Sequence, residues 1–324
     1  MRVFCYTENM TKIFITRKIP EICVTMLKEK GFKVDVSKKN RTLTKKELVN
    51  ILNKNKYDGV VTLLTDKIDK EFLNSLETVK IIANYAVGLN NIDLKEAERL
   101  NIFIANARGT SAKAVAQHVV ALTLAVADRI IEGDYAVRKQ KWKGWLPNFL
   151  IGKDVYGKTF GLIGSGNIGQ KAAETFTLGF GCKILYTDLN ENKELEEKYG
   201  ATRLDLEGVL RKSDIVSLHV PLTKETKHLI NSKNLNKMKP NAILINTARG
   251  PVVDEKALTL ALIKRKIAGA GLDVFEFEPK VGKTLRNLPN VVLSPHIGSA
   301  KESARIEMAV STATNIINFF SKTK

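Results

Sequence analysis

The run Gly-Leu-Ile-Gly-Ser-Gly-Asn-Ile-Gly at residues 161–169 contains the pattern G-x-G-x-x-G. The apolar residues 159–163 predict a buried parallel strand that leads into this pattern, and a segment of helical composition follows it directly. Gly164 would make the tight turn, Gly166 would let the backbone approach a pyrophosphate, and Gly169 would let the helix pack on the strand. The amide groups of the helix N-terminus would then face the phosphates. The run therefore predicts a dinucleotide-binding turn rather than a purely structural glycine turn.

An acidic residue stands where this kind of turn uses one. The second predicted strand, residues 183–186, ends close to Asp188, nineteen positions after Gly169 (188 − 169). A carboxylate at this distance accepts hydrogen bonds from the adenosine ribose of NAD. It should also repel the additional phosphate of NADP, so we expect NAD as the cofactor and NADP as the weaker alternative.

Three reactive side chains follow three further predicted strands. Arg249, Glu278 and His296 come after residues 242–246, 268–274 and 291–294 respectively. Ligands of open α/β sheets bind beyond the carboxyl ends of the strands. An arginine can grip a carboxylate through two hydrogen bonds, and a histidine held by a glutamate can exchange one proton near neutral pH. Next to a nicotinamide, this set predicts hydride transfer to a 2-oxo acid, although each residue type alone is usually a surface charge or a structural group.

The remaining histidines are assigned no chemistry. We expect structural roles for His118, which lies in an apolar segment, and for His228. His219 ends a predicted strand close to the cofactor site, and no proton transfer is assigned to it.

The elements that must position these groups alternate regularly between strand and helix. Helix-capping signals include Thr44 with Glu47, which form a capping box, and Asp69 and Asp93. Such alternation predicts an α/β fold with parallel sheets covered by helices on both faces. The apolar segment 111–131 predicts one long buried helix between domains or subunits.

Composition excludes several classes of protein. The 324 residues suffice for about two domains, and 44% hydrophobic content excludes a mainly disordered chain. No apolar run reaches membrane-spanning length, and the start lacks the pattern of a signal peptide. Three scattered cysteines, Cys5, Cys23 and Cys182, predict a cytoplasmic protein without a metal site. The net charge of +18 comes from lysines spread along the chain, so we expect a solvated surface and no nucleic-acid partner.

Taken together, the motifs resemble the D-isomer-specific 2-hydroxyacid dehydrogenases from about Met10 onward. The matching runs are 84–88 (Asn-Tyr-Ala-Val-Gly), 157–159, the glycine turn, 219–223, 245–250, 271–276 and 294–298. Within that family, Thr16-Arg17-Lys18-Ile19-Pro20, Thr62-Leu63-Leu64-Thr65-Asp66 and Trp145-Leu146-Pro147 resemble the glyoxylate and hydroxypyruvate reductases.

The resemblance implies two doubly wound parallel-sheet domains with a cleft between them. A flavodoxin-like substrate domain would comprise residues 10–110 and 297–324, and a Rossmann dinucleotide-binding domain would comprise residues 111–296. Residues 1–9 would be an extension, and the protein would be a homodimer acting on a small 2-oxo or 2-hydroxy acid.

The resemblance also implies site residues. Arg249, Glu278 and His296 would be catalytic. The substrate would contact Leu64, the backbone N–H groups of Val87 and Gly88, Arg249, and Trp145 from an irregular loop that would reach the partner subunit. Cofactor contacts would come from Gly164, Gly166, Asn167, Ile168, Gly169, Asp188, Val220, Pro221, Thr247, Ala248, Arg249, Asp273, His296 and Gly298.

Two departures and two rival functions remain. Many reductases of this branch have a neutral or basic residue in place of Asp188, and the run 106–111 is less typical of the branch. A phosphoglycerate dehydrogenase without its regulatory domain would need basic groups around Leu64 and Val87, where the sequence is apolar. A corepressor-like dinucleotide sensor would have no need of the complete Arg249, Glu278 and His296 set.

Overall fold

The computed structural model describes residues 10–322, so the predicted extension over residues 1–9 lies outside the described residues. The chain forms two compact units. The first contains the chain up to Ser111 and from Lys301 onward, and the second is Ala112–Ala300. The expected end of the first segment at residue 110 differs from the observed end by one residue, and the expected start of the second segment at residue 297 differs from the observed start by four.

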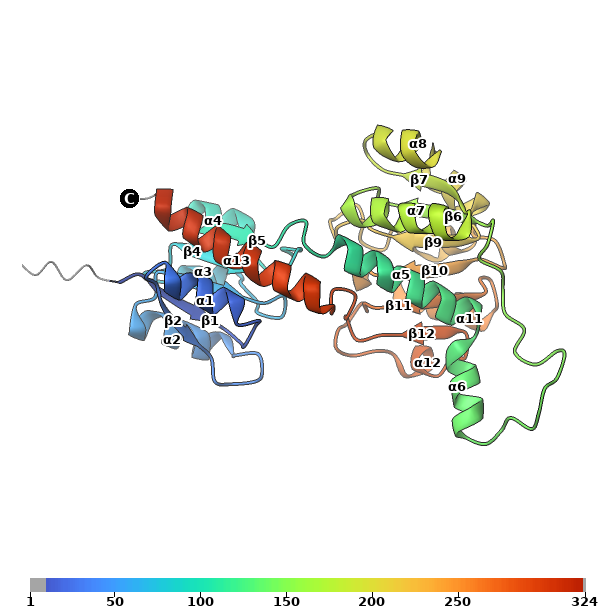
Figure 1. Cartoon of the computed structure of the whole chain (residues 1–324), viewed down its shortest axis with the longest axis horizontal. Helices are drawn as coiled ribbons and strands as arrows, with labels where there is room; N and C mark the ends of the chain where they lie inside the picture. The colour runs from blue at the N-terminus through green and yellow to red at the C-terminus, as the bar shows by residue number, and fades with distance from the viewer. Residues whose placement is uncertain (1–9, 323–324) are drawn as a thin grey trace, which may run out of the picture. The chain divides into compact units, whose positions relative to one another are not determined.

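The first unit is built on a five-stranded parallel sheet with the order β2-β1-β3-β4-β5, the flavodoxin-like order (Figure 1). Its strands are β1 (Lys12–Ile15), β2 (Lys33–Val36), β3 (Gly59–Thr62), β4 (Ile81–Asn84) and β5 (Phe103–Asn106). Its helices are α1 (Ile22–Glu29), α2 (Lys45–Asn55), α3 (Lys70–Asn74), α4 (Leu94–Arg99) and α13 (Glu302–Lys322).

Two apolar clusters cover the two faces of this sheet. Side chains of α1 and α13 form one of them, including Leu27, Met308 and Ile316. Side chains of α2, α3 and α4 form the other. The capping signals are confirmed, since Thr44 and Glu47 form a capping box on α2, and Asp69 and Asp93 cap α3 and α4.

The second unit is built on a seven-stranded parallel sheet with the order β12-β11-β10-β9-β6-β7-β8. Its strands are β6 (Thr159–Ile163), β7 (Lys183–Thr187), β8 (Thr202–Arg203), β9 (Ile215–Leu218), β10 (Ile243–Asn246), β11 (Gly269–Leu272) and β12 (Val291–Leu293). Side chains of α5 (Ala112–Ala127), α7 (Asn167–Phe180) and α8 (Lys193–Tyr199) cover one face. The other face is covered from α9 (Leu206–Lys212), α10 (Ser232–Leu235), α11 (Glu255–Ile263) and α12 (Lys283–Arg286). The predicted α/β class is confirmed.

The prediction of one helix over residues 111–131 is wrong at its end. Helix α5 stops at Ala127, and the chain bends by 62° into α6 (Ile130–Arg138). The bend occurs at Arg129, whose φ of +56° is left-handed. The returning loop also packs against the end of α5, because a Cβ on Gly152 would lie 2.5 Å from the Ala127 carbonyl oxygen. In the part of the chain that the structure describes, no single helix is both long and apolar enough to cross a membrane.

The segment between α6 and β6 extends away from the sheet of its unit (Figure 1). It carries Trp142, which is 55% exposed, and Trp145, which is 82% exposed. Within the described residues, no contact therefore holds the Trp145 ring in a substrate site of its own unit.

Candidate active site

The glycine turn has the geometry that its pattern requires. Gly164 has a φ of +96°, and a Cβ there would lie 2.9 Å from the Val220 nitrogen, so the loop containing Val220 and Pro221 packs directly on the turn. A Cβ on Gly169 would lie 2.5 Å from the Gly164 carbonyl oxygen, which is how closely α7 approaches the turn. A Cβ on Gly166 would meet nothing within 4 Å. The turn is therefore crowded toward the sheet and open at Gly166.

Helix α7 begins in this open region. Gly166 is its N-cap residue, and no side chain of the described residues caps the helix there. The first turn, which includes Asn167 and Ile168, therefore presents backbone N–H groups and the positive end of the helix dipole toward the space beside Gly166. An anionic group such as a pyrophosphate suits this position.

Asp188 directly follows β7 and is held beside the same turn. Its Oδ2 accepts hydrogen bonds from the Ser165 amide at 2.6 Å and hydroxyl at 2.9 Å, and its Oδ1 accepts one from the Leu189 amide at 2.7 Å. Burial pushes the pKa of Asp188 upward, but these hydrogen bonds outweigh burial and leave the pKa below its ordinary value. The carboxylate is therefore charged at neutral pH.

A cation that sequence reasoning missed lies next to Asp188. Arg203, in the short edge strand β8, donates from Nη2 to the carbonyl oxygens of Asp188 and Leu189 at 3.0 and 2.9 Å. Its fifteen-residue separation from Asp188 matches no motif, and only the pairing of β7 with β8 brings the two together.

The three predicted catalytic residues meet at the carboxyl edge of the second unit's sheet. His296 Nδ1 lies 2.9 Å from Glu278 Oε2, and the Phe275 amide donates to Glu278 Oε1 at 3.0 Å. Burial raises the pKa of Glu278. The hydrogen bonds from His296 and Phe275 and the nearby charge of Arg249 lower this pKa by a larger amount, so the net shift is downward. Glu278 is an ionised partner for the histidine.

The loop that carries Arg249 packs closely on the loop after β11. A Cβ on Gly250 would lie 1.8 Å from the Phe275 carbonyl oxygen, so only glycine lets the chain after β10 rest on the chain after β11. Burial lowers the pKa of Arg249, while the charge of Glu278 raises it. An arginine remains cationic under both influences. The structure thus supplies a cation, a carboxylate and an imidazole within one cluster.

The loop that carries Arg249 is held by a residue that sequence reasoning missed. Asn246, the last residue of β10 and 1% exposed, accepts from the Ala248 amide at 3.1 Å and donates to the Arg249 carbonyl oxygen at 3.0 Å. Between them, Thr247 Oγ1 is buried and has no hydrogen-bond partner in the described chain. A buried hydroxyl without a partner is costly, and a bound polar group would satisfy it.

Asp273 holds the loop that carries His296. Its carboxylate accepts from Ser294 Oγ at 2.6 Å and from the amides of Ile297 and Gly298 at 2.9 and 2.7 Å, and His118 Nε2 lies 3.2 Å away. Asp273 is 1% exposed. The structural role expected for His118 fits this geometry, while cofactor contacts from Asp273 and Gly298 stay predictions.

The other two histidines make local contacts. Burial lowers the pKa of His219 to about 3, so it is neutral at physiological pH, and its Nε2 lies 2.9 Å from Ser217 Oγ. His228 Nε2 lies 2.6 Å from Glu276 Oε1. Neither belongs to the cluster of Arg249, Glu278 and His296.

The remaining predicted substrate residues lie in the first unit, at the carboxyl edge of its sheet. Leu64 follows β3 and is 42% exposed, and Val87 follows β4 and is 36% exposed. Gly88 is next to Val87 and partly exposed. All three are accessible side-chain or backbone groups on loops, whereas Arg249 and His296 are in the second unit.

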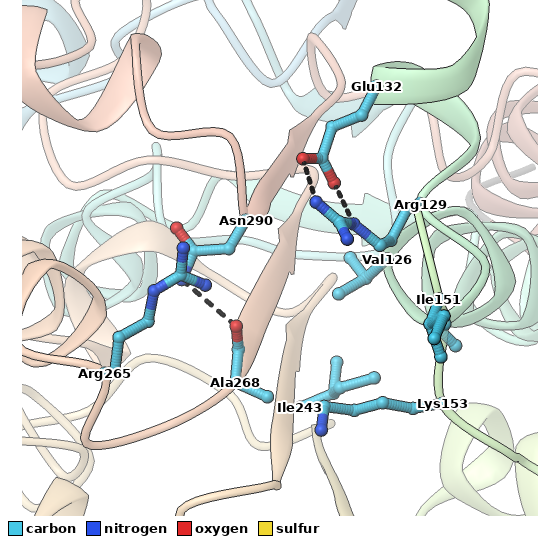
Figure 2. Close-up of a pocket in the computed structure, with 11 residues that line it drawn as sticks. Val126, Arg129, Glu132, Ile151, Lys153, Ile243, Arg265, Ala268 and Asn290 are labelled. Atoms are coloured by element: carbon cyan, nitrogen blue, oxygen red, sulfur yellow. Dashed lines mark hydrogen bonds and ion pairs between the residues drawn. The ribbon is translucent and has the colours of Figure 1, made fainter. Parts of the chain in front are cut away.

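A separate pocket of about 230 Å³ lies in the second unit (Figure 2). Ile243, Ala268 and Asn290 line it, and these residues stand at the start of β10, β11 and β12. Its Arg129 is bound by Glu132 through two hydrogen bonds of 2.7 Å. The pocket is therefore at the amino edge of the sheet, opposite the edge where Arg249 and His296 lie.

Comparison with known proteins matches residues 120–298 to the D-isomer specific 2-hydroxyacid dehydrogenase, NAD binding domain. A glyoxylate reductase from Thermococcus litoralis is 48% identical over 312 residues, which are 95% of this chain and 93% of that protein. The chain belongs to the D-isomer-specific 2-hydroxyacid dehydrogenases. This confirms the resemblance drawn from the sequence motifs.

Solved structures agree with membership of this dehydrogenase family. The crystal structure of a protein from Thermus thermophilus has a TM-score of 0.88 and 38% identity, and covers 95% of this chain and 96% of that one. A glyoxylate reductase from Paecilomyes thermophila has a TM-score of 0.85 and 29% identity, and covers 95% and 94% of the two chains. The two-domain dehydrogenase fold is thereby confirmed.

Proposed function

We propose that the protein reduces glyoxylate or hydroxypyruvate to the corresponding 2-hydroxy acid with NADH. The observation that carries the proposal is the cluster in which Glu278 binds His296 and its charge acts on Arg249. A protein that only sensed a dinucleotide would need no such cluster. Membership of the dehydrogenase family and the glyoxylate reductase activity of its relative support the same function.

The residues around the glycine turn fit a dinucleotide. The open space at Gly166 would admit the pyrophosphate to the start of α7, and the unpartnered hydroxyl of Thr247 would be satisfied by a polar group of the cofactor. Cofactor contacts from Val220, Pro221 and Ala248 belong to the same proposal. When bound, the nicotinamide supplies the hydride that reduces the carbonyl carbon.

Arg249 and the backbone N–H groups of Val87 and Gly88 are the groups proposed to bind the substrate. The guanidinium would grip a carboxylate through two hydrogen bonds, and the backbone N–H groups of Val87 and Gly88 would donate hydrogen bonds to a carboxylate. A cation close to the carbonyl oxygen also favours the negative charge that develops there during reduction.

His296 would donate the proton. Its Nδ1 is held by Glu278, which leaves Nε2 to protonate the carbonyl oxygen as the hydride reaches the adjacent carbon. The ionised Glu278 pairs with Nδ1 and so fixes the orientation of the ring.

We further propose a preference for NADH that depends on Asp188. Its ionised carboxylate should repel a 2′-phosphate, whereas Arg203 at the same strand edge would attract one. Asp188→Ala should therefore reduce the difference between the activity with NADH and the activity with NADPH. The double variant Asp188→Ala/Arg203→Ala should gain less activity with NADPH than Asp188→Ala alone. Equal use of both cofactors by the unmodified enzyme would contradict the role of Asp188.

A spectrophotometric assay of NADH oxidation tests the proposed reaction. Glyoxylate, hydroxypyruvate and pyruvate are offered separately with NADH and with NADPH. Turnover of one of the first two with NADH is the expected result. The absence of turnover with both glyoxylate and hydroxypyruvate would overturn the proposal.

We also propose that the enzyme is a cytoplasmic homodimer. Large hydrophobic side chains are exposed over α6 and the loop after it, among them Ile130, Tyr135, Val137, Trp142 and Trp145. Such a contiguous stretch is typical of a surface that another subunit covers. The cysteines Cys23 and Cys182 are free and buried, which suits a reducing compartment.

A further inference from the structure

Two strand ends of the first unit meet at the loop proposed to bind the substrate carboxylate. Strands β4 and β5 run in parallel, and Asn84 pairs with Asn106 in their register. Both strands therefore end at the same level with an asparagine. Residues 85–88 follow the first of these asparagines and pass beside the second.

Donors at the end of β5 form hydrogen bonds with both carbonyl oxygens that precede the proposed carboxylate-binding amides. The Ala107 amide donates to the Ala86 carbonyl oxygen at 3.0 Å. Asn106 Nδ2 donates to the Val87 carbonyl oxygen at 2.5 Å. In a planar trans peptide the N–H group points opposite to the carbonyl group. Holding these two carbonyls toward β5 therefore turns the N–H groups of Val87 and Gly88 away from β5.

Asn84, the last residue of β4, holds the other end of the same loop. It is fully buried, accepts from Thr62 Oγ1 at 3.1 Å, and donates to the Gly88 carbonyl oxygen at 3.0 Å and to Asn91 Oδ1 at 3.2 Å. Asn91 in turn donates to the carbonyl oxygens of Leu63 and Asp66 at 3.2 and 2.9 Å. The buried network thus ties the Val87 loop to the loop that carries Leu64.

We infer that Asn106 is a positioning residue for the substrate carboxylate. It touches no reacting atom, and it acts by holding the Val87 carbonyl so that the Gly88 N–H group is aimed before the substrate arrives. This inference rests on the proposed function. Preorganised donors bind better because no reorganisation is needed on binding.

Asparagine suits this position for a specific reason. A donor on a short side chain is needed to reach the Val87 carbonyl at 2.5 Å from the end of the neighbouring strand. An aspartate of the same shape has no donor when ionised, and its oxygens would repel the carbonyl. The substitution Asn106→Asp therefore preserves packing while it removes the orienting hydrogen bond.

The test measures the substrate carboxylate and the cofactor separately. Asn106→Ala and Asn106→Asp are compared with the unmodified enzyme for the KM of glyoxylate, kcat, and the Kd of oxamate in saturating NADH. We expect KM and the oxamate Kd to rise by about tenfold, which corresponds to one misaligned hydrogen bond. Because a carboxylate is held in the ground state and the transition state alike, kcat at saturation should change by less than about threefold. The affinity for NADH, which the second unit binds, should stay the same.

Asn53→Ala is the matched control. Asn53 Nδ2 donates to the Ser75 carbonyl oxygen at 2.7 Å, and its Oδ1 accepts from the Glu77 amide at 3.3 Å, so its loss removes side-chain hydrogen bonds of the same unit away from the substrate loop. This control should lower thermal stability without changing KM. Equal effects of Asn53→Ala and Asn106→Ala on KM, or a wild-type KM in Asn106→Asp, would overturn the inference while the proposed function stands. An unmodified enzyme that neither binds oxamate nor turns over a 2-oxo acid would overturn both.

Discussion

At the scale of single residues, the pair of Glu278 and His296 determines the proton chemistry. His296→Asn should lower kcat by roughly 10²–10⁴, the usual contribution of a general acid. Glu278→Gln keeps a hydrogen bond to Nδ1 but removes the negative charge beside the ring, so it should lower kcat by less than His296→Asn does. Steady-state kinetics of both variants with glyoxylate and NADH measure the two effects, and an unchanged kcat in Glu278→Gln would contradict the pairing.

A second prediction at the scale of single residues concerns His219 and the stability of the folded protein. Its pKa is lowered from the ordinary value of 6.5 to about 3 by burial. Between these values the unfolded chain binds a proton that the folded chain does not, so the free energy of unfolding falls as pH falls. This stabilising contribution is fully present above about pH 6.5 and is lost progressively as the pH falls toward 3.

Melting temperatures between about pH 7 and pH 4 check this prediction. The variant His219→Gln should lose less stability over that range than the unmodified protein. Ser217→Ala is the control, since it removes the hydrogen bond at 2.9 Å but retains the imidazole and therefore the dependence on pH. Parallel curves for His219→Gln and the unmodified protein would refute the assignment.

At the scale of elements, the contact of α7 with the glycine turn can be tested within one helix. A Cβ on Gly169 would lie 2.5 Å from the Gly164 carbonyl oxygen, whereas a Cβ on Gly179 would meet nothing within 4 Å. Gly169→Ala should therefore displace the start of α7 and weaken NADH binding by at least about tenfold. Gly179→Ala should leave NADH affinity unchanged and stabilise the protein by up to about 1 kcal/mol, because alanine is the better helix former.

Fluorescence titration with NADH and thermal melts measure both effects. If the two alanine variants bound NADH equally well, the close approach at Gly169 would not matter for the cofactor.

Element-scale features also show what the sequence could predict. The strands, the glycine turn and the capped helices were predictable because apolar runs, glycine spacing and Thr44 with Glu47 act locally. The bend at Arg129 was not predictable, because no proline or glycine marks it, and Gly152, which packs against the end of α5, is distant in the sequence. Asn84, Asn106 and Asn246 were missed for a related reason. A single asparagine at a strand end is part of no spacing pattern, and its role appears only when neighbouring strands bring a second loop within reach.

At the scale of the whole molecule, the exposed segment that carries Trp145 predicts an assembly. If two subunits pair through this segment, Trp145 of each chain would approach its partner's substrate site. Trp145→Ala should then change the ratio of kcat/KM for hydroxypyruvate and glyoxylate while NADH affinity stays nearly constant. Trp142→Ala, at the less exposed ring, should alter assembly more than selectivity. Sedimentation and steady-state kinetics measure these effects, and a monomeric active enzyme would exclude the arrangement.

The division of the chain has a consequence for the order in which the protein folds as it is synthesised. The second unit is one continuous segment, Ala112–Ala300, so all of its residues are available before the chain is complete. The first unit starts earlier but ends later, because α13 contributes Met308, Ala309, Ala313 and Ile316 to its core. Domains fold as units when their residues are available. On the ribosome, the second unit should therefore finish folding before the first unit. The face of the first unit's sheet that α13 covers stays exposed until α13 emerges.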